Sequence, residues 1–146
     1  MAPTPSVTRP VAVQLLIGIA FIDFLSLPHG FRLVPYLGVQ LLMGMGMALA
    51  GAFALLADTR AFAWWYALAQ GALNLIGFFV SRIIGLPLIR HSVAGNWLET
   101  PALALAFCGA ALALLSGWVL YARHFAARHR TDPVTAAHHR APDYFL

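Results

Sequence analysis

Polar side chains stand inside two strongly apolar stretches of the chain, where they could do chemistry within a membrane. Asp23 interrupts the first stretch. The second carries Gln70, Asn74 and Ser81, whose spacings of four and seven residues place them on one helix face. Arg82 stands at the end of that face. A charged residue near mid-bilayer costs at least about 2.5 kcal/mol, so it faces protein or water. We therefore predict one buried polar network of these five residues, centred on an ion pair from Asp23 to Arg82 or a hydrogen bond between Asp23 and Asn74.

Three roles for this network stay open at the level of sequence. A structural clamp would satisfy the buried acid between packed helices. A proton or ion route would use Asp23 and Arg82 in contact with water. A ligand or partner protein would instead bind the polar groups directly.

Histidine is the other residue type with chemical potential, because its imidazole is a common metal ligand. His29 and His91 are expected at the same rim of the membrane, with Glu99 as a third candidate ligand. These residues come from separate segments, and their spacing specifies no site. We therefore predict no metal and no cofactor, and keep an exoplasmic metal or cofactor site at His29 and His91 as a rival hypothesis.

Membrane-spanning helices are the elements that must position these residues. Hydrophobic residues make up 61% of the chain and charged residues 10%. In soluble domains roughly 45 to 50% of residues are apolar and about 25% are charged. Four segments approach or exceed the roughly 20 apolar residues that a spanning helix needs. The first of these helices is expected to end at Pro28-His29-Gly30. We predict an all-α membrane protein with an up-down bundle of four transmembrane helices, at about 11–28, 36–57, 61–81 and 101–121 of a domain covering 11–122.

The distribution of arginines predicts how this bundle is oriented. Six arginines would lie on the side of the two termini and three on the other side, and cytoplasmic loops carry the excess of positive charge. We therefore expect both termini in the cytoplasm. These are an N-terminal tail of 1–10 and a basic, histidine-containing C-terminal tail of 123–146. The fourth helix is expected to continue to about Arg130.

Small residues recur along three of the predicted helices and indicate how they pack. Membrane helices associate through close contacts of small side chains and through polar contacts, because lipid is as apolar as leucine. The second helix carries Gly38, Gly46, Ala50 and Ala54 on one face, and the others repeat small residues every four positions. The predicted packing residues are Gly46, Ala67, Gly71, Gly109, Ala113 and Gly117, contacting each other or another protein's helices.

The segment between the third and fourth helices combines polar and aromatic residues and is expected to form an exoplasmic loop. Trp97 suits the headgroup region, and Glu99 lies at a helix N-terminus, where a carboxylate gains roughly 0.3 to 1 kcal/mol. The candidate residues of this loop are Arg90, His91, Asn96, Trp97 and Glu99.

This segment also resembles a known group of proteins. "SRIIGLP" at 81–87 and "GNWLETP" at 95–101 are similar to a pattern S-R-x-x-G-L-P followed by G-N-W-x-E-P in small four-helix bacterial, often actinobacterial, integral membrane proteins of unassigned function. The resemblance implies the same fold and brings no reaction with it; Arg90, His91 and Thr100 depart from the pattern. The matching positions are Ser81, Arg82, Gly85, Leu86, Pro87, Gly95, Asn96, Trp97, Glu99 and Pro101.

No motif indicates an enzyme, since the sequence has no nucleophile beside a base, no phosphate-binding loop and no clustered carboxylates. Together with the resemblance, these observations predict a small polytopic protein of the bacterial inner membrane that acts by helix packing, as an accessory or scaffolding subunit of a larger membrane complex or as a homo-oligomer. The expected partners are the lipid bilayer and other membrane subunits or a second copy, and not nucleic acid. The alternative is a component of a transporter or channel for a proton, an ion or a small solute, using Asp23 and Arg82.

Overall fold

The described part of the protein forms four helices. The computed structural model describes residues 5–57, 61–83 and 100–130 of the 146-residue chain. Each helix is long and apolar enough to cross a membrane, which confirms the prediction of an all-helical chain with four such segments. The helices are α1 (Pro5–Leu33), α2 (Pro35–Ala57), α3 (Ala61–Ile83) and α4 (Thr100–Arg130).

The end of α1 differs from the prediction. Pro28-His29-Gly30 does not break the helix, which continues to Leu33. Proline removes one backbone donor and frees one carbonyl, and membrane helices tolerate this where neighbouring groups re-satisfy the backbone. Gly30 takes part in helix packing instead of ending the helix, because a Cβ there would lie 2.7 Å from Leu41 and 3.4 Å from the Gly38 backbone.

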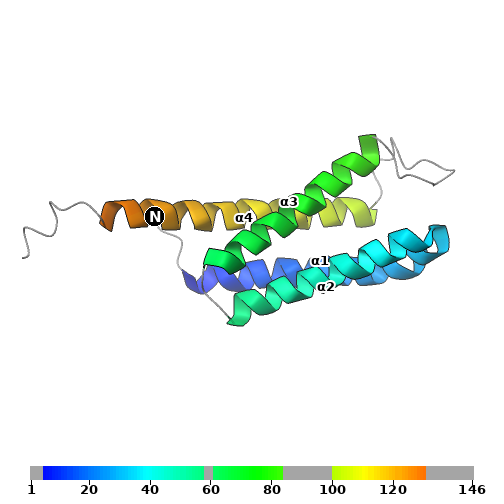
Figure 1. Cartoon of the computed structure of the whole chain (residues 1–146), viewed down its shortest axis with the longest axis horizontal. Helices are drawn as coiled ribbons and strands as arrows, with labels where there is room; N and C mark the ends of the chain where they lie inside the picture. The colour runs from blue at the N-terminus through cyan, green and yellow to red at the C-terminus, as the bar shows by residue number, and fades with distance from the viewer. Residues whose placement is uncertain (1–4, 58–60, 84–99, 131–146) are drawn as a thin grey trace, which may run out of the picture.

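α1 and α2 form a tight hairpin. Val34 is the one residue between them, and its N–H donates to the Gly30 carbonyl while its own carbonyl accepts from Leu37, both at 3.1 Å. Figure 1 shows the two helices lying side by side along most of their length. The hairpin therefore has almost no connecting loop.

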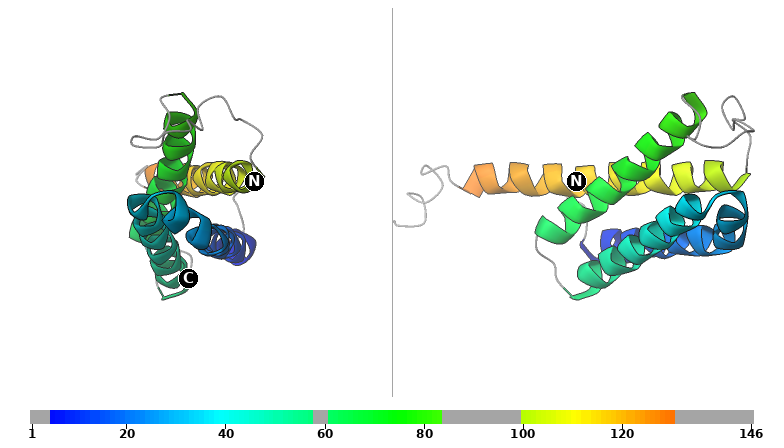
Figure 2. Two further views of the ribbon diagram at one scale, coloured as in Figure 1. Left: turned by 90° about the vertical axis from the view of Figure 1, so that its right-hand side faces the viewer. Right: turned by 45° about the vertical axis from the view of Figure 1, so that its right-hand side comes forward.

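α3 and α4 form the second pair. α4 also packs against α1, whereas α3 touches α2 over a smaller area, so α1 and α3 lie diagonally across the bundle. Figure 2 shows α3 crossing α4 obliquely. The last turns of α4 reach past the other helices, in line with the expected continuation to Arg130 (Figure 1).

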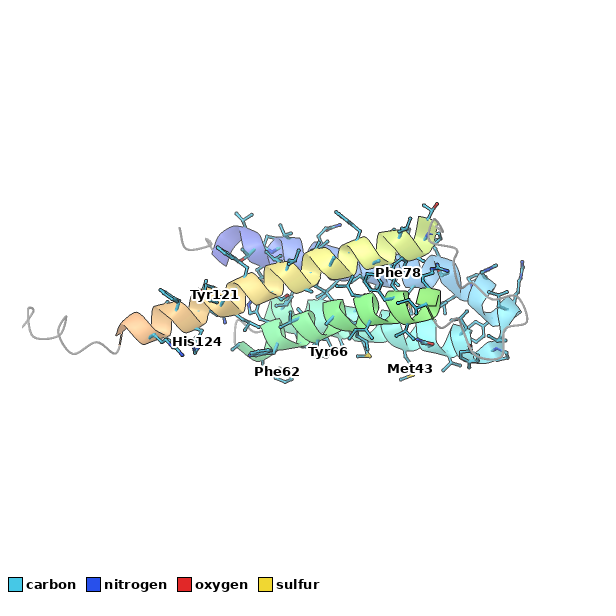
Figure 3. The ribbon with its side chains drawn as sticks, turned by 90° about the horizontal axis from the view of Figure 1, so that it is seen from above. Met43, Phe62, Tyr66, Phe78, Tyr121 and His124 are labelled. Carbon is cyan, nitrogen blue, oxygen red and sulfur yellow. The ribbon has the colours of Figure 1, made fainter. Side chains whose placement is uncertain are left out.

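Large apolar side chains cover the outside of the protein and small ones fill much of its inside. Phe62 is 75% exposed and Met43 is 63% exposed, and both point away from the other helices in Figure 3. Such a surface suits lipid and is incompatible with water. The buried hydrophobic residues are Ala12, Val13, Leu16, Ile19, Ala20, Ala48, Ala52, Leu55, Ala63, Trp64, Ala67, Leu112 and Val119.

Candidate functional site

Asp23 is buried between α1 and α2. Its side chain is 3% exposed and lies against Gly44, where an added Cβ would be 2.9 Å from Oδ2. Asp23 is three residues beyond the middle of the apolar segment Val7–Leu33, or about 4.5 Å along the helix axis. Glycine at position 44 therefore makes room for a carboxyl group deep in the membrane-spanning region.

The position of Asp23 corrects the predicted centre of the polar network. The expected ion pair with Arg82 and hydrogen bond with Asn74 both require α1 beside α3. In the described part of the chain these two helices are diagonal, and Asp23 faces α2 instead. A similar predicted depth in the membrane does not say which helices are adjacent.

A second group of buried polar atoms lies on α3 and α4. Gln70 is 2% exposed and Ser116 is 0% exposed, while Asn74 is half-buried beside Gly109, whose added Cβ would be 3.0 Å from the Asn74 Cβ. Gln70 Oε1, Asn74 Nδ2 and Ser116 Oγ are buried without a hydrogen bond to any other described residue. These atoms therefore keep hydrogen-bonding capacity in the interior. Ser116 was not among the predicted residues, although it interrupts the apolar run of the fourth helix and could have been noticed there.

Ser81 and Arg82 end α3 in different environments. Arg82 is 4% exposed, and its guanidinium carbon lies 5.6 Å from the centre of the Phe78 ring, within cation–π range. The Ser81 hydroxyl donates to the Phe78 carbonyl at 2.7 Å, so it satisfies its own helix. The predicted network is thus divided: Asp23 lies against α2, whereas Asn74 lies beside Gly109 of α4.

Glycines bring the backbones of α3 and α4 into direct contact. A Cβ on Gly71 would lie 2.7 Å from the Gly109 carbonyl oxygen and 2.8 Å from the Ala113 nitrogen. Ala67 is fully buried one turn before Gly71, and Gly117 meets Leu68 one turn after Ala113. The structure thus brings together the predicted packing residues of these two helices.

The predicted packing face of α2 is divided: Gly38 is buried against Phe31, whereas Gly46 and Ala50 do not pack against the described helices of this chain. Gly46 and Ala50 are exposed, and nothing in the described chain lies within 4 Å of a Cβ added to Gly46. The face turned to the other helices carries Ala48, Gly51 and Leu55. Small residues occupy so many positions of α2 that their spacing does not select one face.

Two side chains that the sequence did not single out join the helices. Arg9 donates from Nε and Nη2 to the carbonyls of Leu55 and Leu56, the last turn of α2. A cation at a helix C-terminus also gains from the helix dipole.

Tyr66 of α3 lies over Gly51, where an added Cβ would be 2.8 Å from Cε1 of the Tyr66 ring. Its hydroxyl donates to the Met47 carbonyl at 2.9 Å.

The predicted loop residues lie outside the described part of the chain. Arg90, His91, Asn96, Trp97 and Glu99 all fall in 84–99, outside the described residues, as do the motif positions Gly85, Leu86, Pro87 and Gly95. His29 is exposed on α1. Among the residues that the structure describes, no three histidine, cysteine, aspartate or glutamate side chains are grouped to hold a metal ion.

Comparison of the chain with protein-family models, with curated proteins and with solved structures gave no match.

Proposed function

We propose that the chain is an integral protein of the bacterial inner membrane that acts by helix packing, either as an accessory or scaffolding subunit of a larger membrane complex or as a homo-oligomer. Its four helices form an up-down bundle in this proposal. The bundle presents other helices with a surface to bind, and chemistry is carried out elsewhere.

One observation carries this proposal: the outer surface contains helix positions suited to close packing that the chain itself does not use. Nothing in the described chain lies within 4 Å of a Cβ added to Gly46 or Gly77. Glycine weakens a helix by roughly 0.5 to 1 kcal/mol relative to alanine, whereas it lets a neighbouring helix approach closely. Large exposed side chains flank these positions, among them Met47 beside Gly46 and Ile76 beside Gly77.

Purification in a mild detergent tests the proposal. We expect light scattering to give a protein mass above that of one 15.8 kDa chain, or a second membrane protein to co-purify in a fixed ratio. A monomer without any co-purifying protein, in several detergents and after gentle cross-linking in the membrane, would contradict it.

We also propose that both termini are cytoplasmic. Arg9 and Arg123 lie at the ends of α1 and α4 that would face the cytoplasm, with Arg128 beyond, whereas Arg32 and Arg82 lie at the opposite end of the bundle. The test uses a Cys108→Ala chain with a new cysteine at His29, an exposed residue near the α1–α2 joint. A membrane-impermeant maleimide added to intact spheroplasts should label His29→Cys and leave an Arg128→Cys chain unlabelled; the reverse pattern would invert the topology.

Proton handling is the second candidate function, and the buried position of Asp23 supports it. A carboxyl group buried against Gly44, deep in the membrane-spanning region, can exist as the neutral acid and give up a proton. The predicted pairing with Arg82 is not part of this version. If it is correct, proton flux into liposomes containing the protein falls to background in Asp23→Asn; unchanged flux, or none in the parent protein, would contradict it.

A further inference from the structure

Two of the three glutamines of the chain lie on its lipid-facing surface. Gln14 on α1 and Gln40 on α2 are exposed, whereas Gln70 is buried. Gln14 is seven residues inside the apolar segment Val7–Leu33, about 10 Å along the helix axis. The segment is longer than the roughly 30 Å hydrocarbon core, so Gln14 lies within hydrocarbon near its edge. An amide there gains from a hydrogen-bonding partner that lipid tails do not supply.

Gln14 belongs to a continuous exposed stripe on α1. The stripe, which we call the α1 stripe, has residues spaced alternately three and four apart, and every member is exposed. This repeat of 3.5 residues is the pattern that keeps one helix seam facing a partner helix in a left-handed supercoil. The other faces of α1 are already used, since Leu16 and Asp23 contact α2 and Gly18 faces Cys108 of α4. The α1 stripe consists of Val7, Pro10, Gln14, Ile17, Phe21, Phe24 and Pro28.

Gln40 does not lie on a comparable stripe. The seam through Gln40, traced at alternating spacings of three and four residues, includes Tyr36 at one end and Ala54 at the other. Both are partly buried, so this seam is not exposed along its whole length. The fully exposed seam of α2 passes through Gly46 and Leu49 and carries no polar side chain. Compared with these seams of α2, the α1 stripe is exposed throughout and also carries a side-chain amide.

We propose that the α1 stripe binds the α1 stripe of a second copy, with the two Gln14 amides hydrogen-bonded to each other across the two-fold axis. Two copies inserted with the same topology are related by an axis along the membrane normal, which places identical residues at the same depth. A primary amide carries both a donor and an acceptor, so two of them can exchange N–H···O bonds. A single polar residue in an apolar seam also fixes the register of the pair. This inference rests on the homo-oligomer form of the proposed function and places the contact between copies on α1, apart from the Gly46 and Gly77 positions of α2 and α3, which stay open to another partner.

Cysteine cross-linking in native membranes tests the interface directly. In a Cys108→Ala chain, Ile17→Cys and Phe21→Cys place thiols on the α1 stripe. Phe107→Cys is a control at nearly the same depth, because its neighbour Cys108 faces Gly18, and it is 74% exposed on α4. Copper phenanthroline should convert Ile17→Cys and Phe21→Cys to covalent dimers on a non-reducing gel and leave Phe107→Cys monomeric.

The role of the amide is tested by Gln14→Leu, with Gln40→Leu as the matched control. An interhelical polar contact of ordinary strength in a membrane predicts that Gln14→Leu weakens dimerisation about 3- to 30-fold in a detergent dilution series. Gln40→Leu should leave the dimerisation constant unchanged. Equal constants for the parent chain and Gln14→Leu would overturn the amide contact.

The results also separate this interface from the proposed function. Dimers through Phe107→Cys or Leu49→Cys, without dimers through Ile17→Cys or Phe21→Cys, would overturn the α1 interface and leave self-association standing. A second membrane protein in fixed ratio with one copy of this chain would overturn it and leave the accessory role standing. A monomer with no partner and no cross-link would contradict both the α1 interface and the proposed function.

Discussion

The α1–α2 pair and the α3–α4 pair use glycine in different ways. In the first pair, glycines are recesses for large or polar side chains: Phe31 lies over Gly38, and the Asp23 carboxyl lies against Gly44. In the second pair, Gly71 lies directly on the backbone around Gly109. A side chain can move out of the way, but a backbone in the middle of a helix cannot. The first pair should therefore tolerate change at its glycines better than the second.

Gly71→Ala is the sharpest test of this difference and should have the largest effect. Its Cβ would meet the Gly109 carbonyl oxygen at 2.7 Å and the Ala113 nitrogen at 2.8 Å, so α3 and α4 must separate. We expect a loss of about 3 kcal/mol in the free energy of unfolding, measured by SDS titration in mixed micelles with circular dichroism.

Gly77→Ala is the matched control for Gly71→Ala on the same helix. Nothing in the described chain lies within 4 Å of the added Cβ, so in the single chain, without a partner helix at this position, the variant should be neutral or stabilised by up to about 1 kcal/mol. Equal losses at positions 71 and 77 would show that the backbone contact is not what holds α3 to α4.

Gly44→Ala should have a smaller effect, because the group it meets is the end of a side chain. The added Cβ would lie 2.9 Å from Asp23 Oδ2, and we expect a loss of about 1 to 2 kcal/mol in the same titration. In an Asp23→Ala background the obstruction is absent, so Gly44→Ala should then cost less than about 0.5 kcal/mol. Strictly additive effects of the two substitutions would contradict the contact.

Arg9→Gln tests the polar end of the α1–α2 pair. The variant loses the charged donors that Arg9 offers to the Leu55 and Leu56 carbonyls, and we expect a loss of about 1 kcal/mol in unfolding free energy because the site is partly exposed. Arg32→Gln removes the same charge from the other end of α1, where the side chain is exposed, and should stay within about 0.5 kcal/mol of the parent protein. A larger loss in Arg32→Gln than in Arg9→Gln would rule out the capping contact.

Tyr66→Phe probes the contact between the two pairs and should have the smallest effect. The substitution keeps the ring over Gly51 and removes the hydroxyl that donates to the Met47 carbonyl at 2.9 Å. We expect a loss of about 0.5 to 1 kcal/mol. Tyr121→Phe, on the 62% exposed Tyr121 of α4, should show no change in the same titration.

The sequence predicted the existence of the helices better than their partners. Four long apolar segments leave little choice of fold class, because a membrane admits few backbone solutions. It is harder to predict which helices are neighbours, since this depends on which side chain of one helix fits against which glycine of another. Asp23 was expected beside α3 because Asn74 and Arg82 are polar and near its depth, but the one-residue joint at Val34 sets α1 against α2 along its length.

Glycines account for the remaining differences between prediction and structure. On α3 the small residues Ala63, Ala67 and Gly71 recur every four positions, and all three are buried, so their spacing identifies the packing face. On α2 nearly every second residue is small, and the contacts of Asp23 and Tyr66 decide which glycines face inward. Those contacts come from other helices and leave no trace in the sequence of α2 itself.

The single residue at Val34 bears on how the chain is made. With no loop to bridge them, α1 and α2 cannot be delivered to the bilayer one after the other with a soluble segment exposed in between. We expect them to leave the insertion machinery together as one closed hairpin. Arg9 would reach the carbonyls of Leu55 and Leu56 once the final turn of α2 has left the ribosome, so the α1–α2 pair would close before α3 is inserted.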